Sequence, residues 1–396
     1  MRGFLLLLGG WLLAARLWAA PPAPAPAFLL LDPAALGAYR TAYKAGHQPE
    51  AQQVKAVLTQ ADKALPAAPY TIADKPQVPP SGDKHDYISQ APYWWPDPTK
   101  PGGLPYIQKD GQHNPEAEAM HDTERLSQLC GTVQTLGLAY YFTADERYAQ
   151  KATALLRVFF LDPATRMNPH LNFGQGIPGL NTGRNFGIIE TRHLVAVPET
   201  LALLTGSPSL AAPLVSGLKA WYRAYLTWLT TSPVALPEGE AKNNHGTFYD
   251  TQVVDFALFV GDTAQARRTL RRQTWPRLAV QLAADGSQPL ELARTRPWNY
   301  VGMNLQGWLR LARLAHTAGL DLWHHTTPDG RGLHTATAWF RPYLLHQQQL
   351  DRADVAPTSD RLALGDYALA ATAYPDLDAP AVYRANPGFA PVPWGY

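Results

Sequence analysis

The chain contains little cysteine and little charge. Cys130 is its single cysteine among 396 residues, which excludes an intramolecular disulfide framework and a cysteine-based zinc cage. Charged residues make up 17% of the chain, and 34 Lys and Arg nearly balance 32 Asp and Glu, which speaks against nucleic acid as the partner. Apolar residues reach 46% and aromatic residues 11%, so the chain is not disordered and can bury a large core.

The N-terminus has the composition of a secretory signal peptide. Arg2 precedes an apolar run that ends in the small residues Ala19 and Ala20, so we expect residues 1–20 to be cleaved. Arg16 interrupts this run, which is too short to span a bilayer well, so no stable membrane insertion is predicted. A Pro/Ala-rich leader follows over residues 21–30. The mature protein is therefore expected to be periplasmic or secreted.

Helical periodicity dominates the remaining chain. Apolar residues recur at three- and four-residue spacing, the pattern of a helix with one buried face, from Leu126 to Tyr140, Tyr148 to Phe160, Leu214 to Tyr225 and Tyr300 to Ala315. Long segments rich in Pro, Gly and aromatic residues separate these helices, and no alternating strand pattern is visible. The sequence predicts an all-α protein, an α/α toroid of helical hairpins, with a single domain over residues 31–396.

Two polar clusters lie just before predicted helices. Asn243, Asn244 and His245 form the first, at a helix start that favours an anion. The segment from Arg294 to Tyr300 forms the second, where guanidinium groups can bind a carboxylate through paired hydrogen bonds and a phenol can act as an acid or a base. A capping Asn, a structural His and a core Tyr are the alternative interpretation of the same residues.

Two further segments are candidates for binding a sugar. Tyr93, Trp94 and Trp95 occupy a proline-flanked loop whose flat aromatic faces suit stacking on a sugar ring. Arg184 and Asn185 follow a glycine-rich turn, where they would either line the same cleft or cap the next helix.

Histidine pairs raise the question of a metal site. The candidates are His324 with His325 and His121 with Asp122, and neither pair has a third ligand at suitable spacing. We therefore predict no metal and no cofactor.

Several of these motifs together resemble the alginate lyase family of polysaccharide lyases. They are the segments 93–98, 183–185, 243–247 and 294–300, and the resemblance extends over residues 86–345. It implies an α/α toroid that cleaves an anionic uronic-acid polymer by β-elimination, with alginate or polymannuronate as the first choice and a C4–C5 unsaturated uronate as the new end. The resemblance implies catalytic places for Asn244, His245, Arg294 and Tyr300.

The remaining candidates would bind substrate: Asn243, Arg296, Arg184, Asn185, Tyr93, Trp94 and Trp95. Because Arg296 lies two residues from Arg294, either could be the catalytic arginine. The uronic polymer, the endo or exo mode and the oligomeric state stay open.

The chemistry explains why these residue types occur together. Donors such as Asn244 and His245 would neutralise the uronate carboxylate, so that negative charge can develop when the C5 hydrogen leaves. Where that hydrogen and the C4 oxygen lie on one side of the ring, Tyr300 can serve as both base and acid. Where they lie on opposite sides, His245 is the natural base and Tyr300 the acid. A neighbouring arginine is expected to lower the pKa of Tyr300.

Three other functions are compatible with the sequence. A glycoside hydrolase on the same toroid would need two carboxylates, for which Asp250, Asp255, Glu190 and Glu291 are the candidates. A glucuronan-type lyase would use the same reaction on another polymer. A non-enzymatic carbohydrate-binding protein would use only the aromatic loop.

Overall fold

The computed structural model describes residues 26–356, 358–392 and 394, so the predicted signal peptide lies outside the described residues. The helices are α1 (Pro33–Ala45), α2 (Glu50–Ala64), α3 (Asp122–Thr143), α4 (Glu146–Phe160), α5 (Ala196–Leu203), α6 (Ala212–Thr231), α7 (Leu236–Gly239), α8 (Asn244–Val260), α9 (Thr263–Thr269), α10 (Trp275–Gln281), α11 (Pro289–Leu292), α12 (Pro297–Thr317), α13 (Leu333–Ala338), α14 (Arg341–Leu344), α15 (Arg361–Ala370) and α16 (Ala379–Ala385). The four helices predicted from periodicity are confirmed as α3, α4, α6 and α12.

Helices α3 and α4 form the predicted hairpin. Ala144 ends α3 in the left-handed backbone region, and the side chain of Asp145 accepts a hydrogen bond from the backbone N–H of Arg147 at the start of α4. This cap satisfies a donor that would otherwise be unpaired at the helix start. The connection is therefore short, and α4 packs back against α3.

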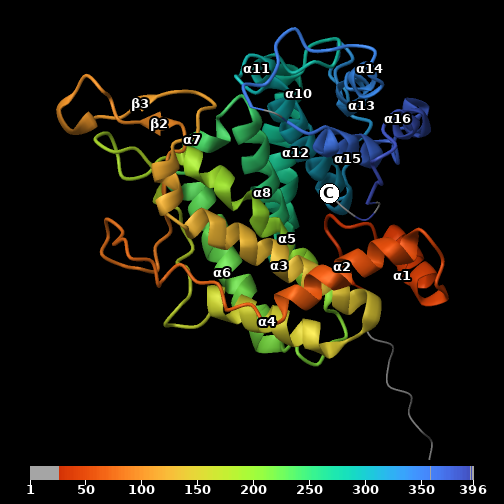
Figure 1. Cartoon of the computed structure of the whole chain (residues 1–396), viewed down its shortest axis with the longest axis horizontal. Coiled ribbons are helices and arrows are strands. Elements are labelled where there is room, and N and C mark those ends of the chain that lie inside the picture. The colour runs from red at the N-terminus through yellow and green to blue at the C-terminus, as the bar shows by residue number, and fades with distance from the viewer. Residues whose placement is uncertain (1–25, 357, 393, 395–396) are drawn as a thin grey trace, which may run out of the picture.

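Helix α8 occupies the centre of the helical array (Figure 1). It packs against α6 and α12, and against the 3₁₀ helix η3 (Asn185–Val195). Phe256 of α8 and Trp308 of α12 are fully buried in one hydrophobic cluster that reaches from Leu30 to Val382. Because α8 is covered on nearly all sides, its first residues are held in fixed positions.

Short strands, which the sequence did not predict, lie in the long loops. β1 (Ile88–Gln90) pairs in parallel with β4 (Phe173–Gly176), and β2 (Trp94–Trp95) pairs antiparallel with β3 (Ile107–Gln108). With two to four residues each, the strands are too short to show an alternating pattern. The β2–β3 hairpin projects from the helical body in Figure 1.

The fold begins before the predicted end of the leader. Glu199 of α5 is fully buried and accepts hydrogen bonds from the backbone N–H groups of Leu29, Leu30 and Leu31. Leu30 is itself fully buried. Residues 28–30, which the sequence assigns to the leader, therefore pack as part of the fold, because a buried carboxylate binds their backbone.

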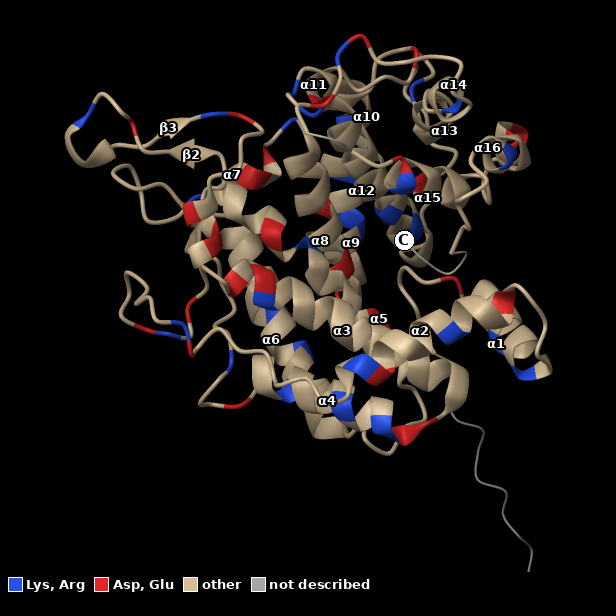
Figure 2. Cartoon of the chain, in the orientation of Figure 1, with Lys and Arg blue, Asp and Glu red and all other residues tan. Residues whose placement is uncertain are grey.

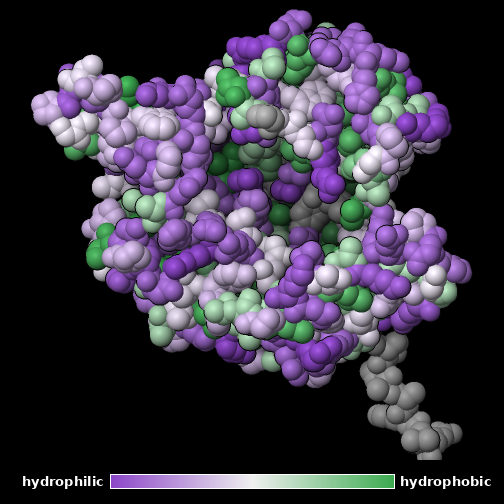
Figure 3. All heavy atoms as spheres, viewed as in Figure 1, coloured by the Kyte–Doolittle hydropathy of each residue, from purple (hydrophilic) through white to green (hydrophobic). Residues whose placement is uncertain are grey.

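The molecular surface is hollowed near the place where α8, α12 and α15 meet (Figure 3). Positive and negative residues are interspersed over the chain, and an acidic residue lies on α7 beside the start of α8 (Figure 2). Within the described part of the chain, no helix is long and apolar enough to cross a membrane.

Candidate active site

His245 lies in the first turn of α8, with its ring fixed by a buried carboxylate. Its Nδ1 lies 2.5 Å from Oε1 of Glu238, a fully buried residue of α7. The amide of Asn185 donates to the other Glu238 oxygen over 2.8 Å. Because an ionised carboxylate can only accept, Nδ1 carries the proton, and Nε2 is the nitrogen that can exchange a proton with a ligand.

The residues on either side of His245 explain the rest of this motif. The side chain of Asn243 accepts a hydrogen bond from the His245 backbone N–H, so Asn243 is the N-cap of α8. Gly246 allows a close approach, since a Cβ there would overlap the carbonyl oxygen of Ala241 and the guanidinium of Arg277. The alternative interpretation of this motif included a helix-capping Asn, and Asn243 is that residue.

Asn244 is buried and bound to a second carboxylate. Its backbone N–H donates to Oε1 of Glu291 over 2.6 Å, and its amide donates to Oε2 over 2.7 Å. Only 1% of Asn244 and 1% of Glu291 is exposed. Asn244 therefore has one amide hydrogen left for a ligand and also holds α11 against the start of α8.

Tyr300 lies in the first turn of α12, and its phenol oxygen has two partners, a guanidinium and a hydroxyl. Nη2 of Arg294 donates to its phenol oxygen over 3.0 Å, and the Tyr93 hydroxyl lies 3.0 Å from the same oxygen. The guanidinium of Arg294 also lies 4.0 Å from the centre of the Tyr300 ring and forms a two-contact ion pair with Asp110. Arg294 thus acts on the phenol directly.

The pKa of Tyr300 differs from the expectation. Burial raises the pKa of this phenol well above its ordinary value, and the Tyr93 hydroxyl adds to the rise. Arg294 does lower it, as predicted, but this effect is smaller than that of burial. The Arg294 hydrogen bonds hold the pKa of Asp110 below its usual range, so the positive charge beside Tyr300 is already paired. The neutral phenol is therefore the resting form of Tyr300.

Arg184 connects the aromatic hairpin to His245. Its guanidinium lies 4.6 Å from the ring centre of Phe186 and 5.9 Å from that of Trp94, and it donates to Gln175 over 2.8 Å. The Phe186 ring meets the His245 ring edge-on at 4.6 Å. Residues from three distant parts of the chain thus form one continuous set of contacts.

Glu291 joins the two polar clusters. Burial raises its pKa, while the hydrogen bonds from Asn244 and the charges of Arg294 and His245 oppose the rise. The backbone N–H of Arg294 donates to the Glu291 carbonyl over 3.1 Å, and the Asn244 amide donates to the Glu291 side chain, so both clusters contact this one residue. The structure places the predicted residues Asn244, His245 and Arg294 around Glu291, with Tyr300 in contact with Arg294.

Two predicted residues lie apart from this set. Arg296 donates to Thr358 over 3.4 Å and lines a separate pocket on another side of α12. Trp95 donates to the carbonyl of Gln112 and lies under the ammonium group of Lys109. Consecutive strand residues point to opposite faces, so Trp94 and Trp95 cannot both face Arg184.

The carboxylates considered for a hydrolase are all buried. Asp250 is paired with Arg277 at 2.7 Å, and Glu190 accepts hydrogen bonds from Tyr87 and Ser89. Asp255 is fully buried, and Glu291 is bound by Asn244 as described above. This arrangement does not provide the pair of accessible acids on either side of a glycosidic bond that hydrolysis needs.

The histidine pairs considered for a metal have other partners. His324 contacts Asp321 at 2.8 Å, and His325 stacks on Trp275. His121 contacts Glu124, while Asp122 is paired with Lys75. Among the residues that the structure describes, no group of three or more His, Cys, Asp or Glu could hold a metal ion. Metal independence stays a prediction.

Sequence reasoning missed Glu238, Asp110 and Phe186. Glu238 and Asp110 lie in segments that the sequence predicts as loops, Phe186 lies in η3, and each reaches the site only through the fold. Glu238 precedes His245 by seven residues in a proline-rich stretch, where an acidic residue is unremarkable. The available signal was the combination of a polar helix start with a nearby acid, which is too common to identify a partner.

The fold and this arrangement define the class of the protein. The fold is an α/α toroid with an imidazole and a phenol in the first turns of two packed helices, α8 and α12, and the protein is a polysaccharide lyase. The alginate lyase family model matches residues 71–350, and the chain belongs to this family. The resemblance and the predicted toroid are thereby confirmed.

Solved structures support the same assignment. The chain is 37% identical to an alginate lyase from Bacteroides ovatus, with 92% of this chain and 95% of the other covered and a TM-score of 0.84. A histidine-to-alanine variant of alginate lyase A1-III complexed with tetrasaccharide, an enzyme known from Sphingomonas species A1, is 16% identical over 88% of this chain and 91% of its own, with a TM-score of 0.53. At that identity the second likeness concerns the fold alone. No curated protein matches the chain.

Proposed function

We propose that this lyase cleaves an alginate-type uronic-acid polymer, with polymannuronate as the first choice, by β-elimination. The observation that carries the proposal is the placement of His245, next to the Asn244 that binds Glu291, and of the Arg294–Tyr300 pair, whose arginine backbone bonds to the Glu291 carbonyl. The family and the name of the solved enzyme that is 37% identical support alginate as the substrate. Export by the predicted signal peptide would bring the enzyme to such a polymer.

The donors around the site would bind the uronate carboxylate. His245, the remaining amide hydrogen of Asn244 and the guanidinium of Arg184 are cationic or polar groups on one continuous set of contacts. Hydrogen bonds to a carboxylate strengthen as charge develops on it, which lowers the barrier to removing the C5 hydrogen. Arg184 is freer to do this than Arg294, whose guanidinium is paired with Asp110.

Tyr300 would protonate the departing C4 oxygen. Its raised pKa keeps the phenol protonated, and Arg294 stabilises the phenolate that remains after the proton is given up. On guluronate, where the C5 hydrogen and the C4 oxygen lie on opposite sides of the ring, His245 is then the base for the C5 hydrogen, because Glu238 holds its Nδ1 and leaves Nε2 for proton transfer. On mannuronate, where both lie on one side, Tyr300 can carry out both transfers, first as the phenolate that Arg294 stabilises, which takes the C5 hydrogen, and then as the phenol that protonates the C4 oxygen.

Product analysis tests this function directly. Polymannuronate, polyguluronate and glucuronan are each incubated with the enzyme, and ultraviolet absorbance is followed for the C4–C5 double bond. We expect the fastest rise on polymannuronate. A fastest rise on glucuronan would correct the substrate, and new reducing ends without absorbance would replace the lyase reaction by hydrolysis.

A further inference from the structure

A second pocket lies on the side of α12 that does not face the candidate active site. It measures about 740 Å³ and is lined by Asn299, Gly302 and Gln306 from α12, and by residues of α15 and the C-terminal segment. At 100° per residue, these three positions share one helix face, whereas Tyr300 and Asn304 lie on the opposite one. The pocket is therefore distinct from the set of contacts around Tyr300.

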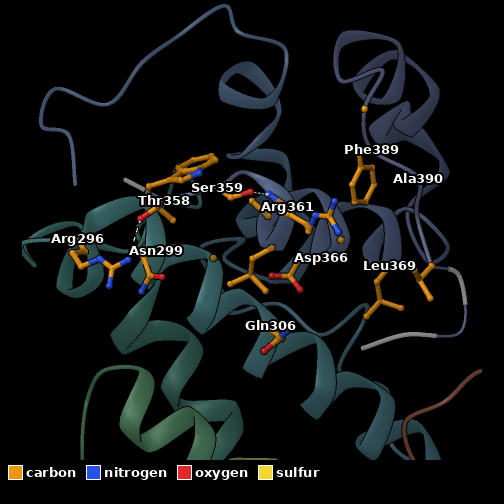
Figure 4. Close-up of a pocket in the computed structure, with 17 residues that line it drawn as sticks. Arg296, Asn299, Gln306, Thr358, Ser359, Arg361, Asp366, Leu369, Phe389 and Ala390 are labelled. Atoms are coloured by element: carbon orange, nitrogen blue, oxygen red, sulfur yellow. Dashed lines mark hydrogen bonds between the residues drawn. The ribbon is translucent and has the colours of Figure 1, made fainter. Parts of the chain in front are cut away.

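Two buried polar atoms without a hydrogen-bond partner belong to residues lining this pocket. One is the Nε–H donor of Arg296, and the other is Oδ2 of Asp366. Asp366 is 3% exposed, so its unpaired oxygen lacks the compensation that a buried polar atom ordinarily finds. Figure 4 shows Arg296 and Asp366 on different sides of the space between α12 and α15. A ligand with both an acceptor and a donor would satisfy the two atoms together.

The other residues that line the pocket indicate which class of ligand it would bind. Arg361, at the start of α15, adds a second guanidinium, while Asn299 and Gln306 add amides and Phe389 adds an aromatic face (Figure 4). Burial raises the pKa of Asp366 well above its ordinary value, and the charge of Arg310 opposes the rise. The two guanidinium groups, of Arg296 and Arg361, favour an anion.

We propose that the pocket between α12 and α15 is a second sugar-binding site, which takes a short acidic saccharide. Figure 4 shows Arg296 and Arg361 at opposite ends of the pocket, so one carboxylate of an acidic disaccharide would pair with Arg296 and the other with Arg361. One hydroxyl would bind Asp366, and a ring face would lie against Phe389. The volume falls within the roughly 300–1,000 Å³ typical of small-molecule sites. The proposal depends on the lining residues and not on the reaction assigned to Tyr300 and His245.

Calorimetric titration of the full chain with a saturated mannuronate disaccharide tests the site. The variant is Arg361→Gln, which removes an exposed guanidinium from the pocket, and the control is Arg384→Gln, an exposed arginine of α16 that does not line it. We expect wild type and Arg384→Gln to bind one more equivalent than Arg361→Gln, or to bind that equivalent roughly tenfold to a hundredfold more tightly. Melting temperatures should agree among the three proteins.

Further titrations and a kinetic measurement identify the kind of saccharide that binds. Mannobiose, the neutral counterpart, should not occupy this site, and equal binding of both sugars would overturn the acidic requirement. A raised KM of Arg361→Gln on polymannuronate would show that a segment of the polymer binds here, whereas an unchanged KM with a lost equivalent would assign the site to free short saccharides. Equal stoichiometry and affinity in wild type and Arg361→Gln would overturn the proposal, whether or not the enzyme cleaves any polymer.

Discussion

The helix-borne donors and the aromatic hairpin meet at the candidate site but are held in different ways. His245 and Asn244 begin a central helix, and each is bound by a carboxylate that is 0% or 1% exposed. Trp94 lies on a two-residue strand whose side chains are half-buried, in a hairpin that projects from the helical body. Groups that transfer protons need fixed positions, whereas groups that hold a flexible polymer tolerate movement. We therefore expect chemistry from the helix starts and binding from the hairpin.

The largest effect is expected for Tyr300→Phe, because Tyr300 touches both regions through Arg294 and Tyr93. Losing the general acid should lower kcat roughly a hundred- to ten-thousand-fold, while the ring and the melting temperature are retained. Tyr148→Phe is the matched control, since its hydroxyl binds Asp62 in the α2–α4 region. Initial rates by ultraviolet absorbance measure the effect. A folded Tyr300→Phe enzyme with more than about a tenth of wild-type turnover would remove Tyr300 from the mechanism.

A slightly smaller loss is expected for His245→Ala, roughly a hundred- to thousand-fold in kcat. His324→Ala is the control, because His324 also has its Nδ1 against a carboxylate, Asp321, but both side chains are more than half exposed. That variant should keep full activity. If His245→Ala and His324→Ala had the same kcat, the burial of the carboxylate partner Glu238 would not explain the function of His245.

Asn244→Ala should lose activity and stability together, which separates it from His245→Ala. Removing the amide leaves a buried oxygen of Glu291 without its donor, at a cost of about 1–3 kcal/mol in the free energy of unfolding. Thermal denaturation and initial rates are measured on the same preparation. An Asn244→Ala protein that melts like wild type would show that the bond to Glu291 does not stabilise the fold.

The comparison of the two regions also explains what the sequence could predict. Long helices such as α3 and α12 repeat their apolar positions many times, so periodicity identifies them. The polar clusters at Asn244 and Arg294 are visible because several chemical groups occur close together in the sequence. Contacts such as Asp110 with Arg294 join residues 184 positions apart, and only the folded chain brings them together.

The environment of a side chain in the hairpin, or of Tyr300, is likewise not visible in the sequence. Three adjacent aromatic residues look equivalent in the sequence, yet strand geometry separates Trp95 from Trp94. The pKa of Tyr300 was expected to fall because an arginine lies nearby in sequence. The expectation was wrong because burial, which a sequence does not quantify, outweighs that charge.

The hairpin should contribute to KM more than to kcat. Trp94→Ala removes the ring beside Arg184, and the loss of this contact and of sugar stacking should raise KM several-fold, up to roughly tenfold. Trp95→Ala should change KM less, because Trp95 packs on Lys109 and Gln112 within the hairpin. Kinetics on long polymannuronate chains measure both variants. A kcat loss in Trp94→Ala that exceeds the rise in KM would place the hairpin in the chemical step.

The smallest effect is expected from alkaline pH on polyguluronate, where the C5 hydrogen and the C4 oxygen lie on opposite sides of the ring, and the response distinguishes the two roles of Tyr300. Because burial raises the pKa of the phenol above its ordinary value, Tyr300 stays protonated as the pH rises, so an acid role predicts a flat kcat from about pH 7 to about pH 9. If a phenolate base were required, only a small fraction would be ionised in this range, and kcat would climb about tenfold per pH unit. The Tyr148→Phe control and a melting curve at each pH exclude effects unrelated to Tyr300. A tenfold climb per unit would make Tyr300 the base, and its proton partner would then be sought in the Tyr93 hydroxyl, which lies 3.0 Å from the phenol oxygen.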